Sequence, residues 1–155
     1  MKSWQMQVRQ IQEKDWEACW KVQHESHSSE KRFSADTWLF ICKNLTDSFV
    51  VVDENDIAIA YWIGSICVND FHLVDDLDDE LSCLAIDVCT HFTYQNQGIM
   101  DLIMPIVTQY HDRIHAYTHK DNLAANGIMT KWGFKKGPYI EENEHYYWSY
   151  ERDNT

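Results

Sequence analysis

The sequence predicts a single α/β domain over residues 1–155, with a mixed central sheet of about six to seven strands and four helices. One observation behind this prediction is that strand-like alternation and helical spacing of apolar residues follow one another along the chain. A second is size, because 155 residues with a hydrophobic share of 45% can bury one proper core. The same length is too short for two ordinary domains.

The first half of the chain is expected to form antiparallel strands and two helices. Residues 5–11 alternate between apolar and polar side chains, which predicts a strand at a sheet edge. Helical spacing follows at residues 14–24, and Ser34 is a good N-cap for a second helix. Apolar runs at residues 46–53 and 57–68, separated by a short polar turn, predict an antiparallel hairpin.

The middle of the chain contains a strand, a polar loop and a helix within residues 84–107. The strand covers residues 81–90, and Gly98 is expected to open the helix, which extends to about Tyr110. The apolar positions of this helix are expected at Ile99, Leu102, Ile103 and Ile106. A helix N-terminus has backbone N–H groups without intrahelical partners, which favour an anion. We therefore expect a phosphate-bearing cofactor at residues 95–100.

The last part of the chain completes the sheet. Residues 113–118 alternate, so the strand, helix and strand from 81 to 118 predict a βαβ unit with two parallel neighbouring strands. Asp121 or Asn122 is expected to cap a further helix, which Gly133 ends. The two closing strands are expected at 134–140 and 145–151.

Charge and composition limit the classes of partner. The formal net charge of −12 argues against non-specific nucleic-acid binding and is compatible with a cationic small molecule or a basic peptide. No apolar run of membrane length exists, and the N-terminal residues lack the apolar region of a secretory signal. The five cysteines form no CxxC or CxxH pair, so we expect reduced thiols in a cytoplasmic protein and no metal site. The acidic segment 69–80 lacks the glycine and spacing of a calcium loop and is expected to be a solvated connection.

Two motifs, taken with the order of elements, resemble the GNAT superfamily of acyl-CoA-dependent N-acyltransferases over nearly the whole chain. The family's pyrophosphate loop reads Arg or Gln, any, any, Gly, any, Gly or Ala. The matching residues here are Gln95, Asn96, Gln97, Gly98, Ile99 and Met100. The second motif is an Asn, an Ala three residues later and a Gly-Phe at the end of the same helix. It matches Asn122, Ala125, Gly133 and Phe134.

The resemblance implies acetyl-CoA as the cofactor. In such an enzyme the backbone N–H groups from Gln97 to Met100 would hold the pyrophosphate. The central strand would bulge near Cys89 and Thr90, whose backbone would pair with the pantetheine arm, and Asn122 would contact that arm. The chain departs from the family pattern at Met100, where a small residue is usual, and at Met129, where many members carry a Tyr acid.

Transfer to an amine also requires a general base near the point where the two parallel strands separate. The candidates are Asp87, His91 and His119. A carboxylate inside an apolar strand is costly unless paired, so Asp87 is either a base or a structural partner of a neighbouring aromatic side chain. The two histidines are either bases or solvated loop residues.

The resemblance places the acceptor groove at residues 24–33 and 141–144. Three glutamates in the second segment favour a small cationic amine or a peptide amine as acceptor, although an ordinary charged turn explains them as well. The sequence is also compatible with a homodimer. A binding or assembly protein with a degenerate GNAT fold and no transferase activity is the alternative, motivated by Met100 and Met129.

Overall fold

The computed structural model describes residues 5–26, 32–66 and 82–152, and the acidic segment 69–80 lies outside them. The helices are α1 (Trp16–Ser26), α2 (Ala35–Asn44), α3 (Met100–Tyr110) and α4 (Leu123–Lys131), with 3₁₀ turns η2 (Glu13–Asp15) and η4 (Phe92–Tyr94). The strands are β1 (Gln7–Gln10), β2 (Phe49–Val52), β3 (Ala58–Ile66), β4 (Ser82–Thr90), β5 (Arg113–His119), β6 (Lys135–Ile140) and β7 (His145–Glu151). The predicted order of strands and helices is confirmed.

Seven strands form one mixed sheet in the order β1-β2-β3-β4-β5-β7-β6. The β2–β3 hairpin is antiparallel, and β1 pairs with β2 at the sheet edge, as predicted. The parallel pair predicted for the βαβ unit is β4 with β5, in a register that runs from Ser82 opposite Arg113 to Ala85 opposite Ala116. None of the helices within the described ranges is long and apolar enough to cross a membrane.

The chain divides into two compact units. The first contains the described residues up to Gly64 together with Asp87–Ile103, and the second contains Ser65–Ile86 and the described residues from Met104 onward. The boundaries between the units therefore fall inside β3, inside β4 and inside α3. That the whole chain forms a single domain stays a prediction.

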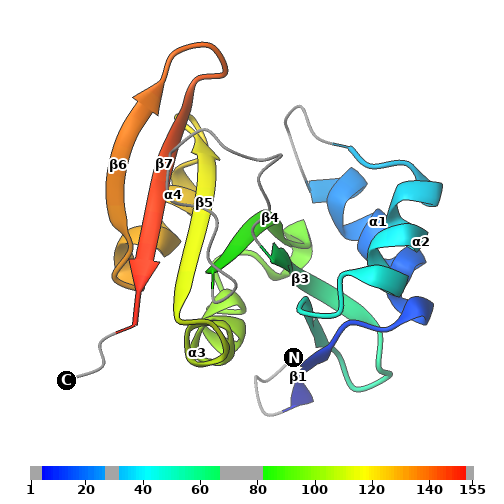
Figure 1. Cartoon of the computed structure of the whole chain (residues 1–155). Coiled ribbons are helices and arrows are strands. Elements are labelled where there is room, and N and C mark those ends of the chain that lie inside the picture. The colour runs from blue at the N-terminus through cyan, green and yellow to red at the C-terminus, as the bar shows by residue number, and fades with distance from the viewer. Residues whose placement is uncertain (1–4, 27–31, 67–81, 153–155) are drawn as a thin grey trace. The chain divides into compact units, whose positions relative to one another are not determined.

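The core of the first unit lies between the two helices α1 and α2 and the strands β2 and β3 (Figure 1). Ser34 caps α2 as predicted, because its hydroxyl accepts a hydrogen bond from the Thr37 N–H at 3.2 Å. The Trp38 and Tyr61 rings are both fully buried and meet edge to face, with 4.9 Å between ring centroids. This aromatic contact joins α2 to β3.

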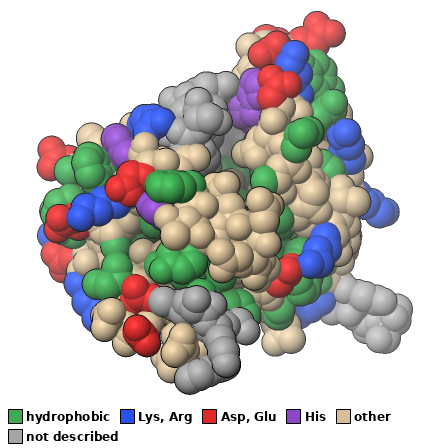
Figure 2. All heavy atoms as spheres, turned by 180° about the vertical axis from the view of Figure 1, so that it is seen from behind, with side chains coloured by type: hydrophobic (Ala, Val, Ile, Leu, Met, Phe, Trp, Pro, Cys, Tyr) green, Lys and Arg blue, Asp and Glu red, His purple; other side chains and the backbone are tan. Residues whose placement is uncertain are grey.

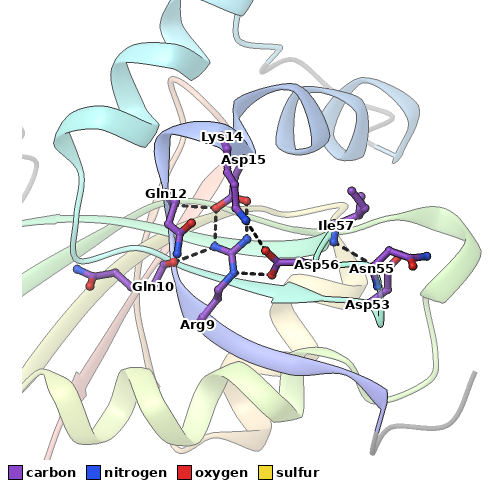
Figure 3. A network of polar contacts seen from close by, with 9 residues as sticks. All are labelled: Arg9, Gln10, Gln12, Lys14, Asp15, Asp53, Asn55, Asp56 and Ile57. Atoms are coloured by element: carbon purple, nitrogen blue, oxygen red, sulfur yellow. Dashed lines mark hydrogen bonds and ion pairs between the residues drawn. The ribbon is translucent and has the colours of Figure 1, made fainter.

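A charged network fixes β1 to the turn between β2 and β3 (Figure 3). The guanidinium of Arg9 donates two hydrogen bonds to the buried Asp15 and a third, at 2.9 Å, to Asp56. Hydrogen bonding to Asp15 raises the pKa of Arg9 further above its ordinary value, and Lys14 and Arg9 lower the pKa of Asp56. Because Asp15 is 3% exposed, Arg9 neutralises a carboxylate that would otherwise be buried without a cation.

The second unit is built on the β5–β7–β6 strands, which lie side by side in Figure 1. Tyr147 and Trp148 are consecutive residues of β7 and both are buried, so both faces of this strand are covered. The Trp148 indole donates to the Thr118 hydroxyl at 2.7 Å. Gly133 has φ of 83° directly after α4 and its C-cap, the left-handed conformation that ends a helix as predicted.

The structure corrects two details of α3. The helix begins at Met100 and not at Gly98, because Gly98 has φ of 72°, which lies outside the right-handed helical region. The buried face consists of Met100, Ile103, Met104 and Val107, whereas Ile106 is 37% exposed. The predicted apolar stripe is therefore displaced by one residue. Both stripes fit helical spacing, and tertiary packing selects between them.

Candidate functional site

The connection between β4 and α3 leaves an exposed polar loop in the first unit. After the turn η4, residues Gln95 to Gly98 are exposed, and Ile99 and Met100 are buried. Asn96 and Gly98 have φ of 64° and 72°, so two residues of the loop are left-handed. Alternation between left-handed and other conformations turns successive N–H groups toward one side, as in anion-binding nests.

The loop is held in place by its own amide side chains. Gln95 Nε2 donates to the Thr90 carbonyl at 3.1 Å, and Gln97 Nε2 donates to the Thr93 carbonyl at 3.2 Å. The Phe92 N–H donates to the Ser26 hydroxyl at the end of α1 at 2.8 Å. These bonds preorganise the loop, and they use the glutamine side chains to satisfy carbonyls while leaving N–H groups available.

The backbone N–H groups of residues 96–100 have no hydrogen-bond partner within the described part of the chain. Ile99, which precedes α3, has no side-chain acceptor that could cap the helix. The start of α3 therefore combines donors without partners and the positive end of the helix dipole. Met100 is 7% exposed and belongs to the buried face of α3, so its bulk lies in the core.

Cys89 and Thr90, the last two residues of β4, contact α1 and the loop that follows. Cys89 is buried, and its thiol is directed toward the Val22 carbonyl of α1, with 3.8 Å between sulfur and oxygen. Thr90 supplies the carbonyl that Gln95 holds. The bulge predicted at these residues stays a prediction.

Asp87 of β4 is the centre of a polar network with α1 and β3. Its Oδ2 atom accepts hydrogen bonds from Gln23 Nε2, at 3.0 Å, and from the Tyr61 hydroxyl. Burial, followed by the negative charge of Asp87, raises the pKa of Tyr61, so the phenol stays protonated and acts as a donor. The partly buried carboxylate is therefore paired with an aromatic residue, as one of the two interpretations of Asp87 predicts, and this pairing also fixes the position that a base would need.

His91 lies at the start of η4 and uses both ring nitrogens. Nδ1 accepts a hydrogen bond from the Thr93 N–H at 3.2 Å, and Nε2 lies 2.8 Å from the Glu25 carboxylate of α1. Accepting at Nδ1 places the proton on Nε2, which then donates to Glu25. In this arrangement His91 caps the turn and ties it to α1.

His119 ends β5 in the second unit and lies in a charged cluster. Its Nδ1 accepts from the Asp121 N–H at 3.1 Å, and its Nε2 lies 3.5 Å from the Glu144 carboxylate. Lys120 forms an ion pair with Glu144 at 3.2 Å. Hydrogen bonding between these two residues lowers the pKa of Glu144 and raises that of Lys120.

Asn122 is the N-cap of α4, one of the two residues predicted for that role. Its Oδ1 accepts from the Ala125 N–H at 3.1 Å, and its N–H donates to the His119 carbonyl at 3.0 Å. Nothing within the described residues accepts a hydrogen bond from Asn122 Nδ2. The side chain thus caps the helix with its oxygen and keeps its amide hydrogens available.

The structure groups the candidate residues in two sets. Asp87 and His91 both contact α1, and with the loop they belong to the first unit, whereas His119 and Asn122 belong to the second. Sequence reasoning missed Gln23 and Tyr61 as partners of Asp87, and it missed Asn126, which bonds Thr118 and the end of β5. Gln23 could have been noticed in the sequence, because it is a polar residue within the apolar stripe of its helix. No such signal in the sequence marks Tyr61 or Asn126.

Charged side chains are dispersed on the face seen in Figure 2, where Lys and Arg residues alternate with acidic ones. On this face the coloured acidic side chains are interspersed with Lys and Arg and do not form one stripe. Attraction of a cationic acceptor would have to come from local clusters such as the β6–β7 turn, where Glu141, Glu142 and Glu144 are exposed.

Comparison with solved structures identifies the fold as that of the GNAT acetyltransferases. The PaiA N-acetyltransferase of Thermoplasma acidophilum, in complex with coenzyme A, is 13% identical and has a TM-score of 0.74, with 95% of this chain and 99% of that chain covered. Arabidopsis thaliana NAA60, in complex with acetyl-CoA, is 17% identical and has a TM-score of 0.73 over the same shares. The ribosomal-protein-S18-alanine N-acetyltransferase of Escherichia coli is 12% identical, with a TM-score of 0.67 over 93% and 90%.

The chain therefore has the GNAT fold, as the sequence motifs predict. No protein-family model matches the sequence, and no curated protein does. At these identities the likeness is one of backbone architecture, and the residues of the site must carry any argument about chemistry.

Proposed function

We propose that this chain is an N-acetyltransferase that transfers the acetyl group of acetyl-CoA to a primary amine. The observation that carries the proposal is the loop before α3, whose N–H groups from residue 96 to residue 100 have no partner within the described ranges. In a GNAT fold this loop is where the resemblance places the cofactor pyrophosphate, and a helix start without a cap favours such an anion.

The residues present fit the cofactor. The N–H groups from Gln97 to Met100 would bind the pyrophosphate, and the exposed side chains of Gln95 and Asn96 border the same loop. The backbone of Cys89 and Thr90 would pair with amide groups of the pantetheine arm. Asn122 Nδ2, a donor that lacks a partner within the described residues, would contact the arm as well.

Asp87 is the general base in this proposal, because Gln23 and Tyr61 hold its carboxylate in one orientation. Bound acetyl-CoA would supply a thioester, so that a C–N bond to the amine would form as the C–S bond breaks. Asp87 would accept the proton that the nitrogen loses. Met129 has no proton to donate to the leaving thiolate, so water would supply that proton. His91 and His119 stay predicted alternatives, and their ring nitrogens are engaged as described above.

The acceptor is proposed to be a small cationic amine or the amine of a protein or peptide. Two structural neighbours act on or bind such polypeptides, namely the ribosomal-protein-S18-alanine enzyme and the NatC complex bound to Gag peptide. The exposed glutamates of the β6–β7 turn would attract a positively charged acceptor. Cys19, Cys42 and Cys89 are buried free thiols, which supports a reducing, cytoplasmic location.

Two measurements test the proposal. Calorimetry with CoA and acetyl-CoA should show micromolar binding, and release of free thiol in the presence of a panel of cationic amines and basic peptides should show turnover. Asp87→Asn should keep binding and lose turnover. Absence of heat at high micromolar ligand would overturn the cofactor assignment, and binding without turnover on any amine would favour the degenerate binding protein.

A further inference from the structure

We propose that Gln23 is a positioning residue that orients Asp87 and ties it to Phe33 and Trp38. This inference rests on the proposed function, in which Asp87 is the general base. The inference depends on the hydrogen bonds of the Gln23 amide, which is fully buried. Its nitrogen donates to Asp87, and its oxygen accepts from two donors elsewhere in the first unit.

The orientation of the Gln23 amide is fixed by its oxygen. Oε1 accepts from the Phe33 N–H at 2.7 Å and from the Trp38 indole N–H at 3.0 Å. Both groups are obligate donors, so the oxygen cannot exchange places with the nitrogen. The Nε2 atom of Gln23 must therefore face Asp87 and donate a hydrogen bond to its carboxylate.

Gln23 and Tyr61 direct their hydrogens to the same oxygen of Asp87, Oδ2. Two donors on one oxygen restrict the rotation of the carboxylate about the side chain. Gln23 is 0% exposed, and water cannot replace its N–H without opening the core. The amide thus determines the direction of the proposed base.

Phe33 links this network to His24 of α1. Its N–H donates to Gln23 Oε1, and its carbonyl lies 2.9 Å from the Nε2 atom of His24. These contacts hold the oxygen side of the Gln23 amide in place, so its nitrogen stays directed at Asp87.

The test uses the full chain and two variants of Gln23. Gln23→Met removes all three hydrogen bonds. Gln23→Glu keeps an acceptor for Phe33 and Trp38 and removes only the donor to Asp87, so it remains informative if the Met variant does not fold. Gln109→Met, on an exposed position of α3, is the matched control. Circular dichroism melting reports folding for each variant.

The expected result is a loss of kcat of about tenfold or more, with an unchanged KM for acetyl-CoA. The loss should appear in kcat and not in KM, and Gln109→Met should show neither change. In an Asp87→Asn background neither variant should lower the residual rate further.

A lower melting temperature with an unchanged kcat would overturn the inference, since a merely structural amide would give that result. Additive losses in the Asp87→Asn background would overturn it as well. Failure of the proposed function is recognised separately, because it appears in the wild-type chain as an absence of acetyl-CoA binding or turnover.

Discussion

The connections from β5 to α4 and from β4 to α3 treat the free N–H groups of a helix start in opposite ways. The connection from β5 to α4 spans residues 120–122, and Asn122 caps α4 by accepting from the Ala125 N–H. The connection from β4 to α3 spans residues 91–99 and ends in Ile99, which has no acceptor to offer. The start of α4 has a side-chain cap. The N–H groups before α3 have no hydrogen-bond partner within the described residues.

The difference shows that polar side chains alone do not identify a ligand site. Both connections contain amide side chains, yet Asn122 uses its oxygen to cap a helix, whereas Gln95 and Gln97 use their nitrogens to hold backbone carbonyls. Hydrogen bonds from the glutamines make the longer loop rigid without consuming its N–H groups. An anion can therefore bind there without first displacing a cap.

The largest effect is expected from Gly98→Val. The residue has φ of 72°, where a β-branched side chain costs about 1–2 kcal/mol or more, so the loop must change conformation. We expect the affinity for CoA in calorimetry to fall by about tenfold or more.

Gly127→Ala is the control, because Gly127 lies inside α4 and a Cβ atom there meets nothing within 4 Å. It should leave CoA binding unchanged and raise stability by about 0.5–1 kcal/mol. Equal affinity of the Gly98→Val variant and the parent chain would show that the loop does not bind the ligand.

Substitutions of Asn122 separate its cap from its amide group. Asn122→Ala should destabilise the chain by about 1 kcal/mol, measured by urea unfolding, because α4 loses its cap. Asn122→Asp keeps a capping oxygen and should restore stability. Both variants lack the Nδ2 donor, so both should bind CoA about two- to tenfold more weakly. Full affinity in the Asp variant would limit Asn122 to a structural role.

Gln95→Ala tests whether the longer loop depends on its own side chains. The bond from Nε2 to the Thr90 carbonyl is exposed, so its loss should cost about 0.5–1 kcal/mol of loop order and reduce CoA affinity about two- to fivefold. Gln109→Ala serves as the control for loss of an exposed glutamine. A loss as large as that of Gly98→Val would mean that Gln95 contacts the ligand directly.

Much of the fold was predictable from local signals. Alternating residues, the Ser34 cap, the polar turn of the hairpin and the glycine after α4 each have a local physical cause, and each prediction is confirmed. The position of the helix start in α3 was not predictable in the same way, because it depends on the left-handed conformation of Gly98. Which of two adjacent stripes is buried depends on tertiary packing.

The sequence predicted the loop before α3, but it did not predict the hydrogen bonds around Asp87. The polar residues before Gly98 signalled a loop from sequence alone, but the partners of Asp87 come from α1 and β3, which are distant in sequence. A sequence can show that a buried carboxylate needs partners. It cannot show that a single amide meets this need while also bonding Phe33 and Trp38.

The smallest effect is expected from Lys120→Ala, which probes the ion pair beside the shorter connection. Hydrogen bonding to Lys120 lowers the pKa of Glu144 from its ordinary 4.5, and Glu144 raises the pKa of Lys120 above 10.5. A carboxylate with a lowered pKa adds stability above pH 4.5 and loses that contribution as pH falls through its folded value. Lys120, whose pKa is raised, loses its contribution to stability above pH 10.5.

Lys120→Ala should therefore melt slightly below the wild type at pH 7, and this difference should vanish at pH 3. Because the pair is exposed, high salt should also remove the difference, while Lys135→Ala, on the exposed strand β6, should show none. A difference that persists at pH 3 would assign the effect to lost packing of the lysine stem and not to charge.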